Sequence, residues 1–461
     1  MTESKSPNIV LILADDMGYG DFGALNHGRT QTPHLDALMA EGVCLTQHYS
    51  ASCVCAPARA GLMTGRYPHR TGAISLMGFR GLDRLALREA TMADLLRNAG
   101  HRTGIVGKWH LGDGDLRYHS RQRGFDEATV FSGGVSDYYS WRLDCNGVRM
   151  KADGRYLTDV ITDESIAFIR RNRHVPFFLY VGYNAPHRPL QAPEEDIRPF
   201  LETGQFGEPV SILYGMIRRM DTGIGRILDA LEAEELDRNT IVLFTSDNGP
   251  DLGTYGGQDQ MRYNCGYRDG KYSVHEGGIR VPMLVRWPDG VEGGRACHEM
   301  IHMADWLPTL LSACGAERPE NPKLDGEDIL PVLRGERNDD VPKRFWQWTR
   351  YHPAMTSNAA MRDGAWKLVR PTIPAGHRMQ PDDAAMSKRI QENPDMPFPV
   401  VDAPLPEIDL SNPPPPELYD VQADPLEQHD LAAEQPERVS RMLRELEAWF
   451  CEVESDRREI G

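Results

Sequence analysis

The sequence predicts an α/β fold in which helices sandwich a large, mixed but mostly parallel sheet, followed by a smaller C-terminal antiparallel sheet with one helix. Residues 8–14, 177–183 and 240–246 are continuous apolar runs, the pattern of strands buried on both faces. Helical stretches separate these strands, and strands that alternate with helices form parallel sheets. A chain of 461 residues is long enough for one large domain and a smaller one.

Capping residues mark the first helix. Thr32 stands at the N-cap position, Pro33 in the first turn and Gly42 just after the last turn. The polar, Gly-rich stretch 250–269 is full of turn formers and predicts a loop on the ligand-binding face. The other elements expected in this half follow from capping signals or apolar periodicity: helices from Pro57 and over 91–100, 159–172 and 212–234, and strands from 103 and over 281–287.

The composition shifts near residues 333–340, and we place a domain boundary there. The predicted parts are a large domain over 1–335 and a C-terminal α+β subdomain over 336–461. Within the second part, Asp363-Gly364 predicts the turn of a hairpin over 359–369.

The rest of the C-terminal part contains one segment of unusual composition. Residues 371–416 are Pro-rich and aperiodic, which predicts an extended loop along the surface. Residues 418–421 predict a strand, and 436–452 an amphipathic helix.

Composition excludes several classes of protein. Hydrophobic residues make up 40% and charged residues 26%, as in globular proteins. The net charge of −17 argues against nucleic acid as a partner, because phosphate binding requires clustered Lys and Arg. No apolar run approaches the length of a membrane span, so no membrane association is expected.

Cysteine usage and the start of the chain give an expected compartment. The eight cysteines are scattered without a disulfide rhythm, which indicates reduced thiols. Residues 1–7 are polar and lack the apolar core of a secretory signal. We therefore expect a cytoplasmic protein, unless an export segment has been removed.

Polar residues follow two of the predicted buried strands. Asp15 and Asp16 come after the first strand, and Asp247 and Asn248 after the third. The carboxyl ends of strands in an open α/β sheet are where ligands bind. Carboxylate and amide oxygens suit calcium or magnesium better than zinc. Taken alone, the Asp15-Asp16 pair could equally serve as a helix cap or a turn.

A short motif in residues 55–66 carries the most specific signal. A lone cysteine is usually a small buried hydrophobe. Here, however, the pattern C-x-P-x-R-x-x-L-x-T-G-R resembles the signature of the type I sulfatases, members of the alkaline phosphatase superfamily. Ala58 departs from it, because the family often has Ser there. The residues that match are Cys55, Pro57, Arg59, Leu62, Thr64, Gly65 and Arg66.

The resemblance implies an alkaline-phosphatase-like fold and a particular chemistry. In this family a maturation enzyme oxidises the motif cysteine to formylglycine, whose hydrate is the nucleophile. The implied ion is calcium, with magnesium as the alternative. The implied metal ligands are Asp15, Asp16, Asp247, Asn248 and the formylglycine made from Cys55.

The resemblance also assigns roles to the surrounding cations. Arg59 stabilises the aldehyde hydrate, and His110 takes the proton when sulfate is eliminated. Lys108 and Lys271 hold the sulfate oxygens. His187 protonates the leaving alcohol or contacts the sulfate. Separately, we expect Arg280 and Glu276 to form a structural ion pair that braces the segment around Lys271.

The predicted function is hydrolysis of a sulfate monoester of a carbohydrate or an aryl alcohol. The partners expected are that small-molecule or oligosaccharide ester and the maturation enzyme. One alternative is a phosphonate monoester or phosphodiester hydrolase of the same superfamily. Another is a catalytically silent binding protein in which Cys55 stays a thiol. Candidates for substrate contacts are Arg80, Arg84, Asp137, Tyr138, Tyr139, Trp141, Arg142 and the loop 251–268.

Overall fold

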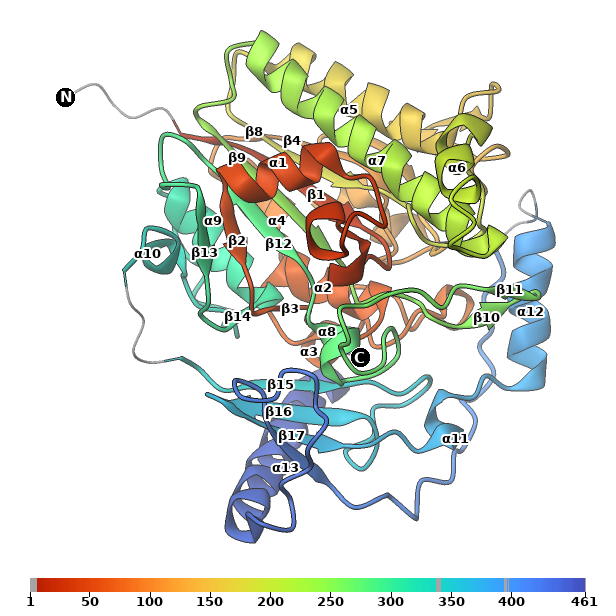
Figure 1. Ribbon diagram of the computed structural model, residues 1–461, viewed down its shortest axis with the longest axis vertical. Coiled ribbons are helices and arrows are strands. Elements are labelled where there is room, and N and C mark those ends of the chain that lie inside the picture. Colours follow the sequence, from red (N-terminus) through yellow and green to blue (C-terminus); the bar gives the residue numbers. More distant parts are fainter. Residues whose placement is uncertain (1–5, 337–340, 394–395, 397, 461) are drawn as a thin grey trace.

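The computed structural model describes residues 6–336, 341–393, 396 and 398–460. Its main element is a ten-stranded sheet in the order β13-β2-β12-β9-β1-β8-β4-β5-β6-β7 (Figure 1). The central strands β9, β1, β8, β4 and β5 are parallel, whereas β12, β6 and β7 pair antiparallel with their neighbours. The predicted mixed, mostly parallel sheet is therefore confirmed. The strands are β1 (Asn8–Ala14), β2 (Val43–Leu45), β4 (Arg102–Lys108), β5 (Glu127–Phe131), β6 (Arg142–Cys145), β7 (Val148–Lys151), β8 (Phe177–Gly182), β9 (Thr240–Ser246), β12 (Met283–Arg286) and β13 (Arg295–Cys297).

Helices cover both faces of this sheet, as its apolar strands require. In β1, Ile9 and Leu11 belong to one buried cluster and Val10 and Ile12 to the other, because successive side chains point to opposite faces. The first cluster includes side chains of α2 (Cys55–Thr64), α4 (Met92–Asn98) and α9 (Trp306–Ala313). The second includes side chains of α1 (Pro33–Glu41), α5 (Leu157–Asn172), α6 (Glu194–Leu201) and α7 (Glu208–Ala233).

The N-terminus of α1 is capped from a distance. Thr32 occupies the N-cap position, but its hydroxyl accepts a hydrogen bond from Gly23 N at 2.7 Å. The carboxylate of Asp221 in α7 accepts instead, from His34 N at 3.1 Å and Leu35 N at 2.8 Å. This contact ties α1 to α7.

The C-terminal part forms a second, four-stranded antiparallel sheet in the order β15-β16-β17-β18. Its strands are β15 (Arg344–Gln347), β16 (Ala359–Asp363), β17 (Trp366–Arg370) and β18 (Glu417–Asp420). The predicted hairpin at Asp363-Gly364 is thus confirmed. Helix α13 (Pro436–Arg458) packs on this sheet and contacts α3 (Pro68–Thr71) of the first part (Figure 1).

The prediction of an extended loop over 371–416 is wrong in part. The segment contains α11 (Pro374–His377) and the longer α12 (Pro381–Glu392). Proline is tolerated in the first turn of a helix. Asp382 and Asp383 lie in the same turn, where their negative charges interact favourably with the positive end of the helix dipole. Asp383 also accepts a hydrogen bond from Tyr351 Oη at 2.7 Å, which fixes the helix to the domain.

The remaining elements are short. No helix in the described ranges is long and apolar enough to cross a membrane. The short elements are β3 (His48–Tyr49), β10 (Thr254–Tyr255), β11 (Gln258–Asp259), β14 (Ile301–His302), α8 (Glu276–Ile279), α10 (Leu330–Leu333) and single 3-10 turns at Tyr19–Asp21, Gly23–Leu25, Gly78–Arg80, Leu116–Tyr118, Ser120–Gln122 and Met303–Asp305.

Candidate active site

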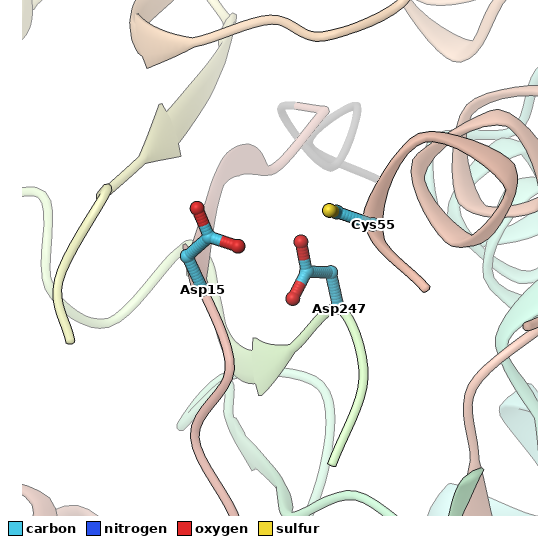
Figure 2. Close-up of side chains that lie close together, drawn as sticks. All are labelled: Asp15, Cys55 and Asp247. Carbon is cyan, nitrogen blue, oxygen red and sulfur yellow. The ribbon is translucent and has the colours of Figure 1, made fainter. Parts of the chain in front are cut away.

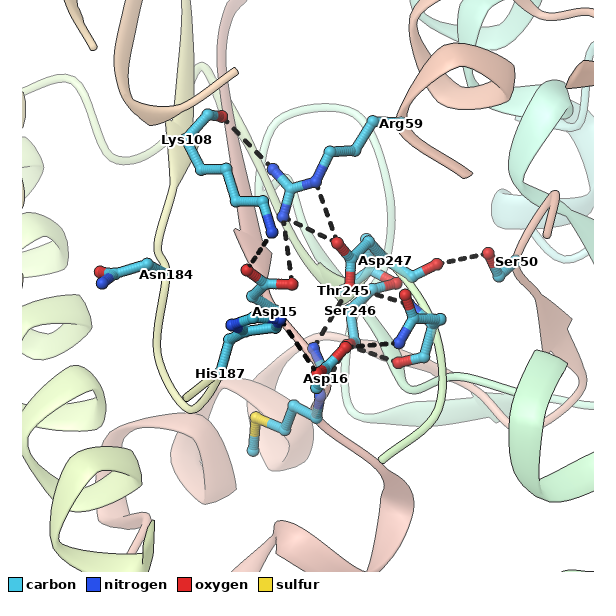
Figure 3. A network of polar contacts seen from close by, with 12 residues as sticks. Asp15, Asp16, Ser50, Arg59, Lys108, Asn184, His187, Thr245, Ser246 and Asp247 are labelled. Atoms are coloured by element: carbon cyan, nitrogen blue, oxygen red, sulfur yellow. Dashed lines mark hydrogen bonds and ion pairs between the residues drawn. The ribbon is translucent and has the colours of Figure 1, made fainter. Parts of the chain in front are cut away.

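Strands of the main sheet end at one edge, where the residues that follow them form a buried polar cluster (Figure 3). β1 and β9 are in register up to their last residues, so Asp15 and Asp247, which come next, lie close together. Lys108 is the last residue of β4, and His187 lies in the segment after β8. All four side chains are buried.

Cys55 faces this edge from the first turn of α2 (Figure 2). Its Sγ and carboxylate oxygens of Asp15 and Asp247 all lie within 4.8 Å of one another. Burial raises the pKa of the Cys55 thiol, although the positive charges of Lys108 and Lys271 oppose that rise. An unmodified Cys55 is therefore a neutral thiol rather than a thiolate nucleophile.

Arg59, one turn after Cys55, joins the two acids. Its Nε and Nη2 lie 2.9 and 2.8 Å from Asp247 Oδ2, and Nη2 lies 3.8 Å from Asp15 Oδ1. Lys108 Nζ donates to Asp15 Oδ2 at 2.5 Å. Burial and the negative charge of Asp15 nevertheless raise the pKa of Asp247 to about 6, against the opposing effect of Arg59 and Lys108.

Asp16 contacts the remaining polar side chains of the cluster. It accepts hydrogen bonds from Lys271 Nζ at 2.8 Å and from Asn248 Nδ2 at 2.7 Å, and His187 Nε2 lies 3.7 Å away. Burial alone would raise the pKa of Asp16, but the charge of Lys271 and the hydrogen bonds from Lys271 and Asn248 hold it well below its usual value. Asp16 is thus a permanent anion.

The cluster fits a hard divalent cation. Within the described residues, Asp15 Oδ1 and Asn248 Oδ1 are buried oxygens without a hydrogen-bond partner; the 3.8 Å approach of Arg59 to Asp15 Oδ1 is an ion pair only. Buried oxygens of this kind are normally satisfied. Together with Asp16 and Asp247 they form an all-oxygen donor set, as calcium and magnesium require.

Two histidines lie beside the cluster. Burial and the charges of Lys108 and Arg59 lower the pKa of His110 well below its usual value. Burial and Lys271 do the same for His187, with Asp16 opposing. Both rings are therefore neutral in the free protein.

The orientation of each ring is fixed by its surroundings. His187 Nδ1 lies 2.8 Å from the Arg188 carbonyl oxygen, so a proton on Nδ1 is donated there and Nε2 is the nitrogen that faces Asp16. A Cβ on Gly134 would lie 2.7 Å from His110 Cε1 and Nε2, so glycine at 134 leaves the space that this ring occupies.

The expected brace of the Lys271 segment is present and larger than predicted. Glu276 Oε2 lies 3.3 Å from Arg280 Nη1 and accepts from Tyr49 Oη at 2.7 Å. Lys367 of β17 adds an ion pair to Glu276 Oε1 at 2.8 Å. The second sheet thereby supports a segment of the first.

The sequence reasoning missed two residues of the cluster. Tyr180 Oη, on β8, accepts from Arg59 Nη1 at 3.1 Å. Asn184 is buried, and neither polar atom of its amide has a partner among the described residues; it lies at the edge of the same network (Figure 3). Its position directly after a buried strand was an available signal.

The structure argues against a substrate-contact role for three candidates. Tyr138 is buried and donates to the carbonyl oxygens of Asn184 and His187, and buried Trp141 donates to Arg155 O. Arg80 Nη2 forms an ion pair with Asp383 Oδ1 at 2.8 Å. The other candidates keep their status as predictions: Arg84, Asp137, Tyr139, Arg142 and the loop 251–268.

A buried cysteine surrounded by acids and fixed cations, at the strand ends of this fold, is the kind of site expected in a hydrolase acting on anionic esters. The family model "Sulfatase" matches residues 7–316, and the model "N-sulphoglucosamine sulphohydrolase, C-terminal" matches residues 264–374. The chain belongs to the sulfatase family, whose members are sulfuric ester hydrolases.

Individual relatives similar to this chain in sequence are also sulfatases. The chain is 33% identical over 390 residues to N-acetylgalactosamine-6-sulfatase of Homo sapiens, covering 75% of this chain and 72% of the relative. It is 33% identical over 419 residues to steryl-sulfatase of Mus musculus, covering 72% and 66%. The curated relatives include arylsulfatase H of Homo sapiens at 31% identity over 424 residues, covering 73% and 74%.

Solved structures share the architecture. The crystal structure of Ps i-CgsB superposes with a TM-score of 0.80 at 30% identity, covering 96% of this chain and 93% of that one. The phosphonate monoester hydrolase of Agrobacterium radiobacter has a TM-score of 0.65 at 20% identity, covering 97% and 96%, which concerns the fold alone.

Proposed function

We propose that the protein hydrolyses a sulfate monoester of a carbohydrate to the alcohol and inorganic sulfate, using a formylglycine made from Cys55 and a calcium ion. The observation that carries the proposal is the approach of Cys55 Sγ to Asp15 and Asp247 within 4.8 Å. Carbohydrate specificity is supported by the relatives named N-acetylgalactosamine-6-sulfatase and by Ps i-CgsB, which was crystallised with a neocarrahexaose.

Asp15, Asp16, Asp247 and Asn248 would hold the ion. When bound, it would supply positive charge that offsets the sulfate ester and favours the deprotonated form of a nearby hydroxyl. Formylglycine at position 55 would supply a hydrated aldehyde, with one hydroxyl to attack sulfur and a second to release sulfate. Cys55 is 2% exposed, so its oxidation must precede closure of the fold around it.

The remaining residues position charge and protons. Lys108 and Lys271 donate hydrogen bonds to Asp15 and Asp16, respectively. Both ammonium groups would also face the oxygens of a bound sulfate ester and stabilise its negative charge. Arg59 holds Asp247 in place. His110 would accept a proton from the hydrate during sulfate release.

His187 would give a proton to the leaving alcohol. Its pKa is depressed in the free protein by burial and by Lys271. The negative charge of a bound sulfate ester would offset that cation and raise the pKa again. Protonation of His187 is thereby linked to substrate binding, which is when a general acid is needed.

The test combines mass spectrometry with turnover. Protein produced together with a formylglycine-generating enzyme is digested, and we expect the peptide with residue 55 to have lost one sulfur and two hydrogens and gained one oxygen. The same protein should release sulfate from N-acetylgalactosamine 6-sulfate or 4-nitrophenyl sulfate, and Cys55→Ala should abolish release without changing the circular dichroism spectrum. Cys297→Ala, which removes a buried thiol elsewhere, is the control.

Two results would refute the proposal. One is an unmodified Cys55 in protein that turns over sulfate esters. The other is faster hydrolysis of a phosphonate or phosphate ester than of the sulfate ester of the same alcohol, which would favour a phosphoester hydrolase instead.

A further inference from the structure

Two arginines lie on aromatic rings near the site without the usual acidic partner. Arg188 Cζ lies 3.9 Å from the centre of the Tyr255 ring. Arg350 Cζ lies 5.7 Å from the centre of the Tyr272 ring and 5.5 Å from that of Trp348. Both arginines are half-buried, so their guanidinium groups are held in place and still accessible.

Both arginines border the candidate active site. Lys271 Nζ lies 5.6 Å from the centre of the same Tyr272 ring that Arg350 contacts. Arg188 directly follows His187, and its positive charge is one of those that lower the pKa of that histidine, after burial and Lys271. The arginines thus lie beside the groups that would hold the sulfate ester.

Neither guanidinium forms an ion pair with any carboxylate in the part of the chain that the structure describes. Arg350 Nε donates to the His377 carbonyl oxygen at 2.6 Å, which uses one of its donors. By contrast, Arg80, also half-buried, pairs with Asp383 at 2.8 Å.

The two charges also repel each other. Burial lowers the pKa of Arg350, tyrosines nearby oppose this, and the charge of Arg188 lowers it further. Asp251 is close enough to influence Tyr255 and Tyr272 but is within ion-pair distance of neither arginine. A pair of half-buried cations without a counter-charge is a site that an anion would stabilise.

The second sheet places Arg350 there. Asn358, directly before β16, donates from Nδ2 to the carbonyl oxygens of Tyr272 and Trp348, each at 2.9 Å. This one side chain therefore joins the Lys271 segment to the segment that carries Arg350. The position of Arg350 relative to the site is fixed by hydrogen bonds rather than by a free loop.

We propose that Arg188 and Arg350 bind a second sulfate group on the substrate, so that the preferred substrate is a carbohydrate carrying at least two sulfates. The guanidinium fork donates parallel hydrogen bonds to tetrahedral oxyanions, and charge-assisted contacts of this kind are the strong ones. This inference rests on the proposed function for the position of the first sulfate, and it concerns which ester binds best.

Binding is measured by calorimetry on the full-length Cys55→Ala protein in calcium buffer, which removes turnover from the experiment. The probes are two matched pairs: N-acetylgalactosamine 6-sulfate with its 4,6-disulfate, and glucosamine 6-sulfate with its 2-N,6-O-disulfate. We expect the disulfate of at least one pair to bind about tenfold or more tightly than its monosulfate. Arg188→Gln and Arg350→Gln should each reduce that ratio at least several-fold, and Arg188→Lys should retain part of it.

The matched control is Arg438→Gln, because Arg438 also lies on an aromatic ring, 4.1 Å from the centre of Trp366, but on α13. It should leave the ratio unchanged. Equal affinities within both pairs, no detectable binding of either disulfate, or a ratio that survives both Gln variants would each overturn the proposal. If Arg350→Gln fails to fold, Arg188→Gln alone decides.

The outcome is separable from that of the proposed function. A preference for the disulfates that depends on the two arginines, in a protein that never releases sulfate, would refute the hydrolysis and keep this inference. Sulfate release without such a preference would support the hydrolysis and refute this inference.

Discussion

Arg59 contacts a single carboxylate oxygen of Asp247 through two nitrogens: Nε donates a hydrogen bond at 2.9 Å, and Nη2 forms an ion pair at 2.8 Å. Both side chains are fully buried, and 188 residues separate them in the sequence. Nη2 also lies 3.8 Å from Asp15, so one guanidinium offsets two acids. The two acids proposed as metal ligands are thus held near one another by a fixed charge of the protein itself.

Replacing Arg59 by Met should destabilise the protein strongly. The change removes a positive charge that offsets the buried negative charges of Asp15 and Asp247. Losing one partner of a buried ion pair costs about 3–5 kcal/mol. We expect a fall of this size in the free energy of unfolding measured with urea in the presence of a chelator. Calcium should recover part of the loss, because it binds the folded state and supplies positive charge.

The control for this experiment is Arg219→Met. Arg219 pairs with Asp159 at 2.7 Å in a partly exposed position, where an ion pair is worth about 1 kcal/mol or less. Equal losses for the two variants would show that the Arg59 contact has no special role.

Asp247→Ala should remove calcium binding together with activity. Asp247 is buried and close to Asp15 and Cys55, and no other described side chain replaces its carboxylate there. We expect calcium affinity, measured by calorimetric titration, to fall about a hundredfold or more. Asp229→Ala, on the exposed face of α7, should bind calcium as the parent does. Tight calcium binding by Asp247→Ala would place the ion elsewhere.

Calcium affinity should weaken as the pH falls through 6. The pKa of Asp247 is raised to about 6 in the metal-free protein, so below that pH the carboxyl is protonated and must lose its proton before it can bind the ion. Asp16 stays ionised over this range because its pKa is lowered. Below pH 6 the affinity should drop about tenfold per pH unit, with proton release on binding. In Asp247→Asn the residual affinity should lose this pH dependence, and an unchanged slope would contradict the assignment.

Gly134→Ala should reduce turnover through His110 alone. The added Cβ would lie 2.7 Å from two atoms of the imidazole, so the ring must move away from its position beside the cluster. We expect kcat to fall about tenfold or more, as for a displaced general base, with calcium affinity unchanged. The matched change Gly207→Ala, whose Cβ would meet nothing closer than 3.8 Å, should leave kcat near that of the parent. Normal turnover by Gly134→Ala would remove His110 from the mechanism.

Local patterns were sufficient to predict most elements of the fold. The apolar runs of β1, β8 and β9 indicated buried strands, and Asp363-Gly364 indicated the hairpin of the second sheet. The prediction of an extended loop in the Pro-rich segment is wrong over α12, because a high proline content does not exclude a helix that begins with Pro381 and continues through good helix formers. Proline in the first turn carries a different meaning from proline in the middle of a helix.

By itself the sequence determined which side chains stand at the ends of strands and which motif surrounds Cys55, since both depend on neighbours in the chain. Tertiary structure decided the rest: the capping of α1 by Asp221, the contact of Tyr180 with Arg59, and the approach of Arg188 to the Tyr255 ring and of Arg350 to the Tyr272 ring. These contacts join segments that are distant in sequence, and their geometry depends on sheet register and on how the second sheet packs. Such distances are set by the packing of the whole chain, which no local pattern encodes.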